Sequence, residues 1–431
     1  MTLRDNNNNP VTGQTVAFTS TLGTLGNVTE QASGFYTATL TAGTVSGVAS
    51  LSVSVGGNAL GVTPATVTLN GDSGNLSTTN STLVAAPVNI EANGSDTSVV
   101  TLTLRDNNNN PVTGQTVAFA STLGTLGNVT EQASGIYTAI LTAGTVAGIA
   151  SLSVNVGGTA LGVTPATVAL NGDSGNLSTT NSTLVAAPVN IEANGSDTSG
   201  VTLTLRDNNN PVTGQTVAFA STLGTLGNVT EQASGIYTAT LTAGTVAGIA
   251  SLSVNVGGTA LGVTPATVAL NGDSGNLSTT NSTLVAAPVN IEANGSDTSG
   301  VTLTLRDNNN NPVTGQTVAF ASTLGTLGNV TEQASGIYTA TLTAGTVAGI
   351  ASLSVNVGGT ALGVTPATVA LNGDSGNLST TNSTLVAAPV NIEANGSDTS
   401  GVTLTLRDNN NNPVTGQTVA FGTLGTLCQP P

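Results

Sequence analysis

Apolar and polar residues alternate along much of this chain. In the stretch 200–205, Val201, Leu203 and Leu205 are separated by Thr202 and Thr204. A period of two residues is typical of a strand with one buried face, so these three apolar residues are predicted to face a core. The same alternation predicts further core positions: Val217, Phe219, Tyr237, Ala239, Leu241, Leu252, Val254, Val256, Val268 and Leu270.

Turn signals separate these alternating segments. Asn194-Gly195 suits a tight turn, and the Gly-punctuated TLGTLGNV at 222–229 suggests a short, bent strand. About seven short strands at spacings of about 8–12 residues are typical of a β-sandwich. No stretch shows a convincing helical period of 3.6 residues, so we expect an all-β fold.

The pattern repeats about every 100 residues. RDNNNNPVTGQTVAF at 306–320, or the same stretch with one asparagine fewer, begins at Arg4, Arg105, Arg206, Arg306 and Arg407. A unit of this length is large enough for one sandwich with its own core and exceeds most solenoid repeats. We place boundaries in polar segments such as NGDSGNLSTTNS, 171–182. The predicted modules are 1–72, 73–173, 174–273, 274–374 and 375–431, with the first and last incomplete.

The asparagine run is predicted to be a loop. It has four residues at 107–110 but three at 208–210. A shift of one residue inside a paired strand would turn every later side chain to the wrong face, whereas a loop absorbs the change at little cost. We therefore expect this run to lie at one end of each sandwich.

Composition excludes several classes of protein. The chain has 5 Arg, no Lys and no His against 21 acidic residues, a net charge of −16 that would repel nucleic acid and anionic lipid. Its one cysteine, Cys428, cannot form a disulfide within the chain. No run of 18 apolar residues and no signal peptide occur, so we expect no direct membrane insertion of this segment. Because MTLRD aligns with the middle of a strand, we expect either a piece of a longer surface protein or a truncated reading frame.

Candidate chemistry is sparse. The run at 106–110 offers side-chain oxygens at alternate positions, as calcium loops do, but Pro111 and Val117 stand where an EF-hand has Gly and Glu. Solvated turn residues are the alternative. No other cofactor and no catalytic residue is expected; SDTSG at 196–200 is loosely similar to an aspartic-protease turn but lacks a partner carboxylate in one cleft. The candidate calcium ligands are Asp106, Asn108, Asn110, Glu192, Asp197 and Asp273.

Two further residue types recur with the repeat, Arg once in each of the five units and Tyr once in each of the first four. Arg206 and its copies precede an Asp, and we expect each to pair with an acidic side chain, an interaction that contributes little when exposed. Tyr237 and its copies are expected to be core or corner residues instead of binding residues.

The repeated residues resemble a known family. VTLTLRDNNNNPVTGQTVAF, then GTLG, then SGIYTATLTAGTVAGIASLSVNV is similar to the group 1 bacterial immunoglobulin-like domains of the intimin and invasin adhesins. The resemblance covers all five units and implies tandem immunoglobulin-like β-sandwiches arranged as an elongated rod, outside a bacterial outer membrane. Three complete and two partial modules would reach on the order of 150 Å if joined end to end.

Two functional hypotheses follow. The first is a non-enzymatic stalk or spacer of a bacterial cell-surface adhesin, which holds a binding tip away from the outer membrane. Its host partner, a protein or a glycan, would be bound by parts of the parent protein outside this sequence. The alternative is an array that itself binds host protein or glycan through its end loops, around Asn208–Pro211. A calcium-stiffened rod is a third hypothesis.

Overall fold

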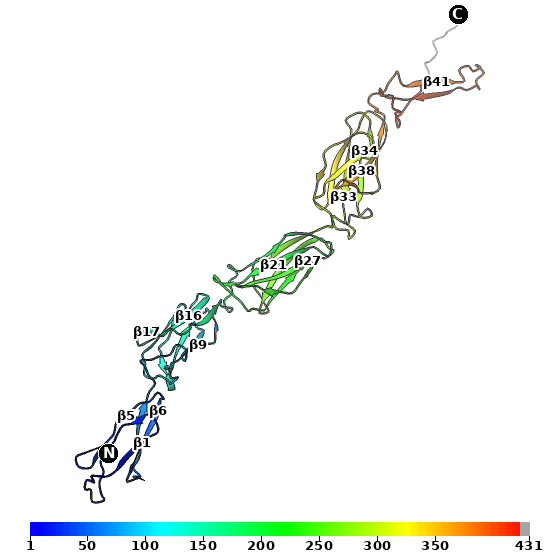
Figure 1. The fold of residues 1–431 in the computed structure, drawn as a ribbon. Coiled ribbons are helices and arrows are strands. Elements are labelled where there is room, and N and C mark those ends of the chain that lie inside the picture. Colours follow the sequence, from blue (N-terminus) through cyan, green and yellow to red (C-terminus); the bar gives the residue numbers. More distant parts are fainter. Residues whose placement is uncertain (423–431) are drawn as a thin grey trace. The chain divides into compact units, whose positions relative to one another are not determined.

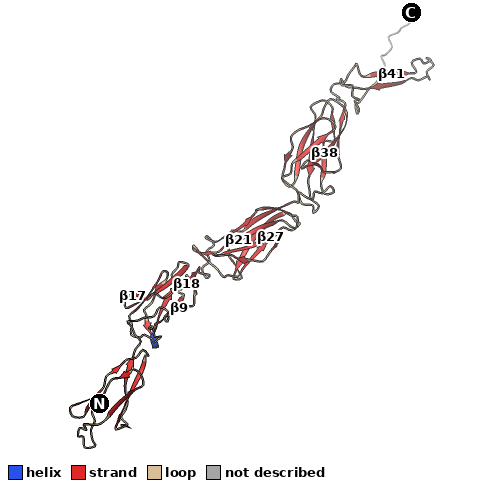
Figure 2. Ribbon diagram, viewed as in Figure 1, coloured by secondary structure: helices blue, strands red, loops and turns tan. Residues whose placement is uncertain are grey.

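The computed structural model describes residues 1–422. Residues 423–431, which include Cys428 and the end of the fifth predicted module, lie outside the described residues. The described chain consists of strands and loops, with one short 3-10 turn, η1 (Ala133–Gly135), in the second repeat (Figure 2). The five predicted modules are called the first to fifth repeats from here on. This secondary structure confirms the expectation of an all-β fold.

The strands of the first two repeats are short. The first repeat contains β1 (Val16–Ser20), β2 (Thr24–Leu25), β3 (Thr29–Gln31), β4 (Phe35–Thr37), β5 (Leu40–Thr41), β6 (Gly47–Val55), β7 (Asn58–Ala59) and β8 (Ala65–Leu69). The second contains β9 (Thr82–Ala86), β10 (Asn89–Glu91), β11 (Thr97–Thr103), β12 (Val117–Ser121), β13 (Thr125–Leu126), β14 (Thr130–Glu131), β15 (Ile136–Thr142), β16 (Gly148–Val156), β17 (Thr159–Ala160) and β18 (Ala166–Asn171).

The later repeats follow the same series. The third contains β19 (Thr183–Ala187), β20 (Asn190–Glu192), β21 (Thr198–Thr204), β22 (Arg206–Asp207), β23 (Asn210–Pro211), β24 (Val217–Ser221), β25 (Thr225–Leu226), β26 (Thr230–Glu231), β27 (Ile236–Thr242), β28 (Gly248–Val256), β29 (Thr259–Ala260) and β30 (Ala266–Asn271). The fourth contains β31 (Thr283–Ala287), β32 (Asn290–Glu292), β33 (Thr298–Thr304), β34 (Val318–Ser322), β35 (Thr326–Leu327), β36 (Thr331–Glu332), β37 (Ile337–Thr343), β38 (Gly349–Val357), β39 (Thr360–Ala361) and β40 (Ala367–Asn372). The fifth contains β41 (Thr384–Ala388) and β42 (Gly401–Thr405).

The chain folds as two compact units. The first holds residues 1–183, 204–216 and 231–237, and the second holds the rest. The whole of the second repeat lies in the first unit, and the whole of the fourth repeat lies in the second unit. Each of these two repeats therefore shows the complete arrangement of strands within one unit.

Two sheets form the second repeat, coloured cyan in Figure 1. One has the order β13-β15-β11-β9, with β14 also paired to β15; the other has the order β10-β18-β16-β12, with β17 paired to β16. All pairs are antiparallel except β10 with β18, which is parallel. The fourth repeat has the same two sheets, built from β31 to β40. The chain thus crosses from one sheet to the other directly after its first strand.

The core lies between the two sheets. In the second repeat Val100 and Leu102 of one sheet and Leu152 and Val168 of the other belong to one buried cluster. Strand β11 pairs with β15 so that Leu102 lies opposite Tyr137, and both side chains are buried. Because alternate residues of a strand face opposite sides, the threonines between them face outward. This is the two-layer sandwich that the sequence predicts.

The predicted core positions of the third repeat are confirmed with one exception. All of the apolar residues named in the sequence analysis are buried apart from Phe219, which is only partly buried. Seven strands of the second repeat have three residues or more, and the short, bent strand suggested at 222–229 has its counterpart in β13, within the stretch 122–129. The two-residue pairings β14 and β17 were not predicted. Two-residue strands are too short to carry a readable alternation.

The recurrent tyrosine is a corner residue, as predicted. The hydroxyl of Tyr137 donates to the carbonyl of Val112 at 3.2 Å and accepts from the amide of Gln115 at 3.1 Å. Burial raises the pKa of this phenol. Gly135 precedes the tyrosine's strand with φ of 74°, and a Cβ there would lie 2.8 Å from the Leu104 carbonyl oxygen, so the close approach of backbone requires glycine.

Candidate functional site: the junction between repeats

Two polar segments meet where one repeat follows another. The first is the connector between β8 and β9, residues 70–81, which contains no strand. The second is the asparagine loop of the following repeat, Asp106–Pro111, which follows β11. Leu76 of the connector forms a β-bridge with Asp106 of the loop. This meeting place is called the junction below, and it occurs four times in the described chain.

A buried carboxylate organises the junction. Asp106 is only 1% exposed, and both of its oxygens accept hydrogen bonds. Oδ1 accepts from the amides of Asn108 at 2.9 Å and Asn110 at 2.8 Å, while Oδ2 accepts from the amide of Asp72 at 2.9 Å and from the Asn110 side chain at 2.8 Å. Four N–H donors compensate the loss of water around this charge. The bond from Asp72 ties the connector to the loop.

The pKa of Asp106 reflects two opposing causes. Burial acts to raise the pKa because it disfavours the charged form. The hydrogen bonds from the side chain of Asn110 and from the amides of Asp72, Asn110 and Asn108 outweigh burial and lower the pKa below its ordinary value. Asp307 and Asp408 have pKa values lowered by the same balance. The junction carboxylate is therefore ionised at neutral pH.

The last asparagine of the loop reaches the preceding repeat. The side chain of Asn110 donates to the carbonyl of Thr44 at 2.8 Å and accepts from the amide of Ser46 at 2.9 Å. These two bonds join residues that are 66 and 64 positions apart in sequence. Both partners on the preceding repeat are backbone groups. The same side chain also bonds Asp106, so one amide links the carboxylate to the neighbouring sandwich.

A glycine lets the two segments approach closely. Gly172 donates its amide to the carbonyl of Pro211 at 3.0 Å, and a Cβ at this position would lie 2.5 Å from that oxygen. A Cβ at Gly71, Gly272 or Gly373 would likewise lie 2.4–2.5 Å from the carbonyl oxygen of Pro111, Pro312 or Pro413. A side chain here would force the connector away from the loop.

The same bonds recur at the later junctions. Asn210 bonds Thr145 and Ala147, Asn311 bonds Thr245 and Ala247, and Asn412 bonds Thr346 and Ala348, all at 2.8–3.0 Å. Asp307 and Asp408 each accept the same four hydrogen bonds as Asp106. Every junction thus repeats one arrangement. The asparagine loop of the third repeat varies around its aspartate, as the Discussion describes.

The arginine before the loop has a different partner from the one expected. The guanidinium of Arg105 donates to the carbonyl of Asn109 at 2.8 Å, and Arg206 does the same to Asn209 at 3.0 Å. The structure therefore gives these arginines a backbone oxygen in their own loop instead of the acidic side chain that we predicted.

The calcium candidates fall into two groups, one in the second repeat and one in the third. Asp106 and Asn110 are used in the junction, and Asn108 is exposed with its amide on Asp106. Asp197 accepts from the Asn194 side chain at 2.8 Å and from the Glu192 amide at 3.0 Å in a turn of the third repeat. Asp273 accepts from the Gly275 amide and the Asn276 side chain, while Glu192 accepts from the Ser274 hydroxyl at 2.5 Å.

These placements bear on metal binding. Within residues 1–422, no three His, Cys, Asp or Glu side chains come together in a way that could hold a metal ion. Asn194 bonds Ser196 and Asp197 as a turn residue does, and the bond to Asn194 lowers the pKa of Asp197. Calcium binding stays a prediction, and the oxygens of Asp106 already have N–H donors. The described residues contain no helix long and apolar enough to cross a membrane.

Comparison with known proteins identifies the repeats. Five segments match the family described as invasin, domain 3: residues 1–72, 77–173, 178–273, 278–374 and 379–429. A structure of FdeC, an Escherichia coli adhesin, is 28% identical, covers 71% of this chain and 100% of its own, and has a TM-score of 0.56. InvD of Yersinia pseudotuberculosis is 35% identical, covering 69% of this chain and 98% of its own with a TM-score of 0.49.

The chain is therefore an array of immunoglobulin-like domains of the kind found in cell-surface adhesins. It belongs to the invasin domain 3 family, since that family's model matches nearly the whole sequence. This confirms the resemblance to the intimin and invasin adhesins. Domains of this family are structural and binding modules, so the chain is not an enzyme.

The sequence did not reveal the junction. The residues of the asparagine loop were assigned to a loop correctly, but their partners were not found. Asp72 and Asp106 are 34 residues apart, and each lies in a separate polar segment. The available signal was that Asp, the last Asn and Pro of the loop recur together with a Gly-Asp pair in every connector. Recurrence alone does not say which of these groups touch.

Proposed function

We propose that this chain is a stalk that holds a binding tip of its parent adhesin away from a bacterial outer membrane. The observation that supports this most directly is the junction, which recurs four times with the same two bonds to the preceding repeat. A hydrogen-bonded junction restricts the angle between neighbouring repeats more than a bare flexible linker does. Repeats that differ little in sequence add reach without adding chemistry.

The module boundaries at residues 72, 173, 273 and 374 are part of this proposal. Each falls in a connector, directly beside the Asp whose amide bonds the next loop, as Asp72 bonds Asp106. The connector is thus shared between two modules and is not a free tether. The proposed localisation is the bacterial cell surface, and the proposed host partner is bound elsewhere in the parent protein.

Small-angle scattering on the chain tests the stalk. A stiff array of sandwiches, each about 35–40 Å long, gives a maximum dimension on the order of 150 Å and a cross-section of one sandwich. Replacement of the last loop asparagine by alanine at all four junctions (N110A, N210A, N311A and N412A) is expected to shorten the average dimension while each sandwich stays folded. A wild-type chain that scatters as a collapsed globule or as a loose coil would contradict the proposal.

A recess beside the junction favours the second candidate, an array that itself binds host protein or glycan. It has a volume of about 260 Å³ and includes Ile149, Asn171, Pro211 and Thr213 in its lining. A counterpart of about 300 Å³ includes Ile249 and Pro312. Ile149 is 68% exposed, although it is a large apolar side chain. Most other residues of the asparagine loop serve the junction, so a ligand would meet Pro211 more readily than Asn210.

Binding of the chain to host cells or to a glycan array distinguishes the two candidates. The stalk predicts no binding above background for the wild-type chain. The binding array predicts a signal that Ile149→Ser, Ile249→Ser and Ile350→Ser together reduce, while the outward Thr167→Ser leaves it unchanged.

A further inference from the structure

Two strands that lie near the entry and the exit of a repeat are direct neighbours. In the second repeat, β10 follows the first strand, β9, and β18 is the last strand before the connector. These two strands are parallel, with Asn89 opposite Ala169 and Glu91 opposite Asn171. The same parallel pairing joins β20 to β30 and β32 to β40. The incoming end of one strand and the outgoing end of the other therefore lie at opposite ends of the pair.

This arrangement decides how the pair responds to tension along the chain. Tension pulls the incoming end of β10 and the outgoing end of β18 in opposite directions, so the two strands are forced to slide along each other. All hydrogen bonds between sliding strands are loaded at the same time and must break together. Strands that are pulled apart from one end lose their bonds one after another, which needs less force. Tension along the chain therefore loads the parallel pair in its stronger direction.

Hydrogen bonds beside β10 lengthen the contact. The Ala169 amide donates to the carbonyl of Val88 at 2.8 Å, and the Ala92 amide donates to the carbonyl of Asn171 at 2.6 Å. The third and fourth repeats have the same two bonds at 2.7–2.8 Å. Val88 and Ala92 flank the three residues of β10, so the bonded segment is longer than the strand itself.

A side-chain bond extends the pair beyond the last strand. Glu91, the last residue of β10, accepts a hydrogen bond from the hydroxyl of Ser174 at 2.5 Å, and Ser174 lies three residues after the end of β18. The copies of these two residues in the third and fourth repeats form the same bond, also at 2.5 Å. A hydrogen bond to a charged acceptor is stronger than one between neutral groups. Because Ser174 belongs to the outgoing chain, tension loads this bond together with the strand pair.

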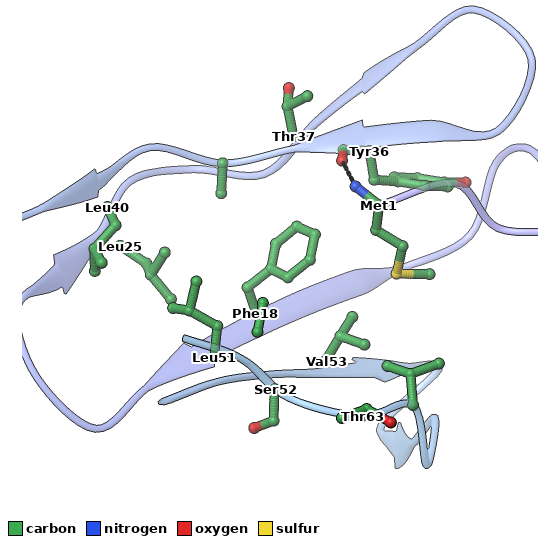
Figure 3. A pocket seen from close by; sticks show the side chains of 13 residues that line it. Met1, Phe18, Leu25, Tyr36, Thr37, Leu40, Leu51, Ser52, Val53 and Thr63 are labelled. Carbon is green, nitrogen blue, oxygen red and sulfur yellow. Dashed lines mark hydrogen bonds between the residues drawn. The ribbon is translucent and has the colours of Figure 1, made fainter. Parts of the chain in front are cut away.

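Sliding of β10 would also disturb the core. Ile90 of β10 and Leu170 of β18 are cross-strand partners, and both side chains are buried in the cluster between the sheets. Figure 3 shows inward packing of the same kind in the first repeat, where Phe18 and Val53 point toward Tyr36 around a recess. A displaced β10 would pull Ile90 out of its contacts and expose apolar surface to water, which adds to the resistance.

We propose that the second, third and fourth repeats bear tension: in each, the parallel strand pair and the Glu–Ser bond form a clamp that resists pulling along the chain. In the second repeat the clamp consists of Val88–Ala92, Ala169–Asn171 and Ser174. The inference deepens the proposed stalk and rests on it for the source of the load, because a stalk whose tip holds a host surface is pulled at both ends. The clamp itself is a property of each repeat, so it can fail its test while the scattering test still supports the stalk.

Single-molecule pulling on the whole chain in two directions tests the clamp. In a Cys428→Ser background, Val88→Cys with Thr179→Cys carries handles that make the strands slide, while Val88→Cys with Thr167→Cys pulls them apart from one end. All three handle positions are exposed. We expect the first direction to need at least about twice the force at the same pulling speed. Both directions act on the same folded repeat, so a difference reports the direction of the load. Equal forces, or a lower force in the first direction, would overturn the proposal.

Serine substitutions in these chains test the side-chain bond. Ser174→Ala removes its donor. Ser121→Ala is the matched control, because the Ser121 hydroxyl donates to the carbonyl of Leu123 at 2.6 Å, outside the clamp. In the sliding direction, Ser174→Ala is expected to raise the unfolding rate at a fixed force about tenfold, and Ser121→Ala to keep it within about threefold of the parent chain. In the other direction Ser174→Ala should act no more strongly than the control, because its bond is loaded last. Equal effects of the two variants in the sliding direction would overturn the assignment of this bond to the clamp.

Discussion

The second and third repeats differ at three places in sequence. Val99 and Ile140 of the second are replaced by Gly200 and Thr240 in the third, and the asparagine loop of the third is one residue shorter. Asp106 of the second repeat accepts four hydrogen bonds, three from its own loop and one from the connector. Asp207 in the third accepts two, from the amides of Asp173 and of Asn210 at 3.1 Å. The shortening therefore removes bonds around the carboxylate.

The bonds to the preceding repeat survive the shortening. Asn210 still donates to Thr145 at 3.0 Å and accepts from Ala147 at 2.9 Å. The backbone adjusts instead: Asp207 and Asn210 pair as strands β22 and β23, and Asn208 has φ of 26° where Asn109 has φ of 64°. The comparison separates two roles of the loop. The contact of its last asparagine with the neighbouring repeat does not depend on the loop length, whereas the full set of hydrogen bonds to the carboxylate, two of them from the same asparagine, requires the longer loop.

The largest expected effect is the removal of that carboxylate. Asp106→Ala leaves four N–H donors without their acceptor, and we expect the free energy of opening of this junction to fall by on the order of 3 kcal/mol. Asp207→Ala removes two bonds and should cost about half as much. Amide hydrogen exchange at Asp72, Asn110, Asp173 and Asn210 measures both. Equal losses at the two junctions would show that the number of bonds does not decide the difference.

Restoring the missing residue should have the next largest effect. Insertion of an asparagine after Asn209 is expected to stabilise the third junction by about 1–2 kcal/mol, since it recreates two hydrogen bonds to Asp207. Slower exchange of the Asp173 amide would report the gain. Insertion of a glycine at the same place is the control, because it restores the loop length with greater backbone freedom. If the asparagine insertion instead weakened the contact with Thr145, the separation of the two roles would be wrong.

The other two differences form one contact. Val99 and Ile140 lie directly opposite each other on β11 and β15, and both are exposed. Cross-strand apolar pairs contribute about 0.2–1 kcal/mol. Val99→Gly and Ile140→Thr should each destabilise the second repeat by about 0.5–1 kcal/mol, and the double variant by less than their sum. Denaturant unfolding of the four members of the cycle measures the coupling. Strict additivity would mean that the two side chains do not interact.

Acid should have the smallest of these effects near neutral pH. The stability of the junction around Asp106 should change little there and should fall progressively as the pH is lowered. The pKa of Asp106 is lowered in the folded state, so its contribution to stability is fully present above the ordinary Asp pKa of about 3.9. That contribution is lost as the pH falls through the lowered folded value. Hydrogen exchange of the Asp72 amide between about pH 5 and pH 2, corrected for intrinsic rates, follows it. Asp106→Asn, which cannot ionise, should remove this part of the pH dependence.

The sequence predicted the strands because their information is local. The alternation at Val201, Leu203 and Leu205 states which residues face the core, and a two-layer sandwich is the arrangement that buries such faces. The variable length of the asparagine run likewise showed a loop. The junction was beyond local inference, since Asn110 and Thr44 are 66 residues apart. Asn108 and Asn110 were predicted to offer oxygens to a cation, but in the structure they donate N–H groups to Asp106. Which of these groups faces the carboxylate depends on the backbone conformation of the loop.

The two bonds from Asn110 to the preceding repeat go to main-chain atoms of Thr44 and Ser46, and the equivalent amide belongs to an alanine at the other three junctions. The neighbour's side chains therefore have no part in the contact made by this asparagine. The side-chain bond that crosses the boundary, from Ser274 to Glu192, joins residue types that recur at the second and fourth junctions. Any copy can follow any other without a compensating substitution. Unequal recombination between the nearly identical coding stretches could then change the number of copies by whole units, and each new border would form the same contact as the one it replaced.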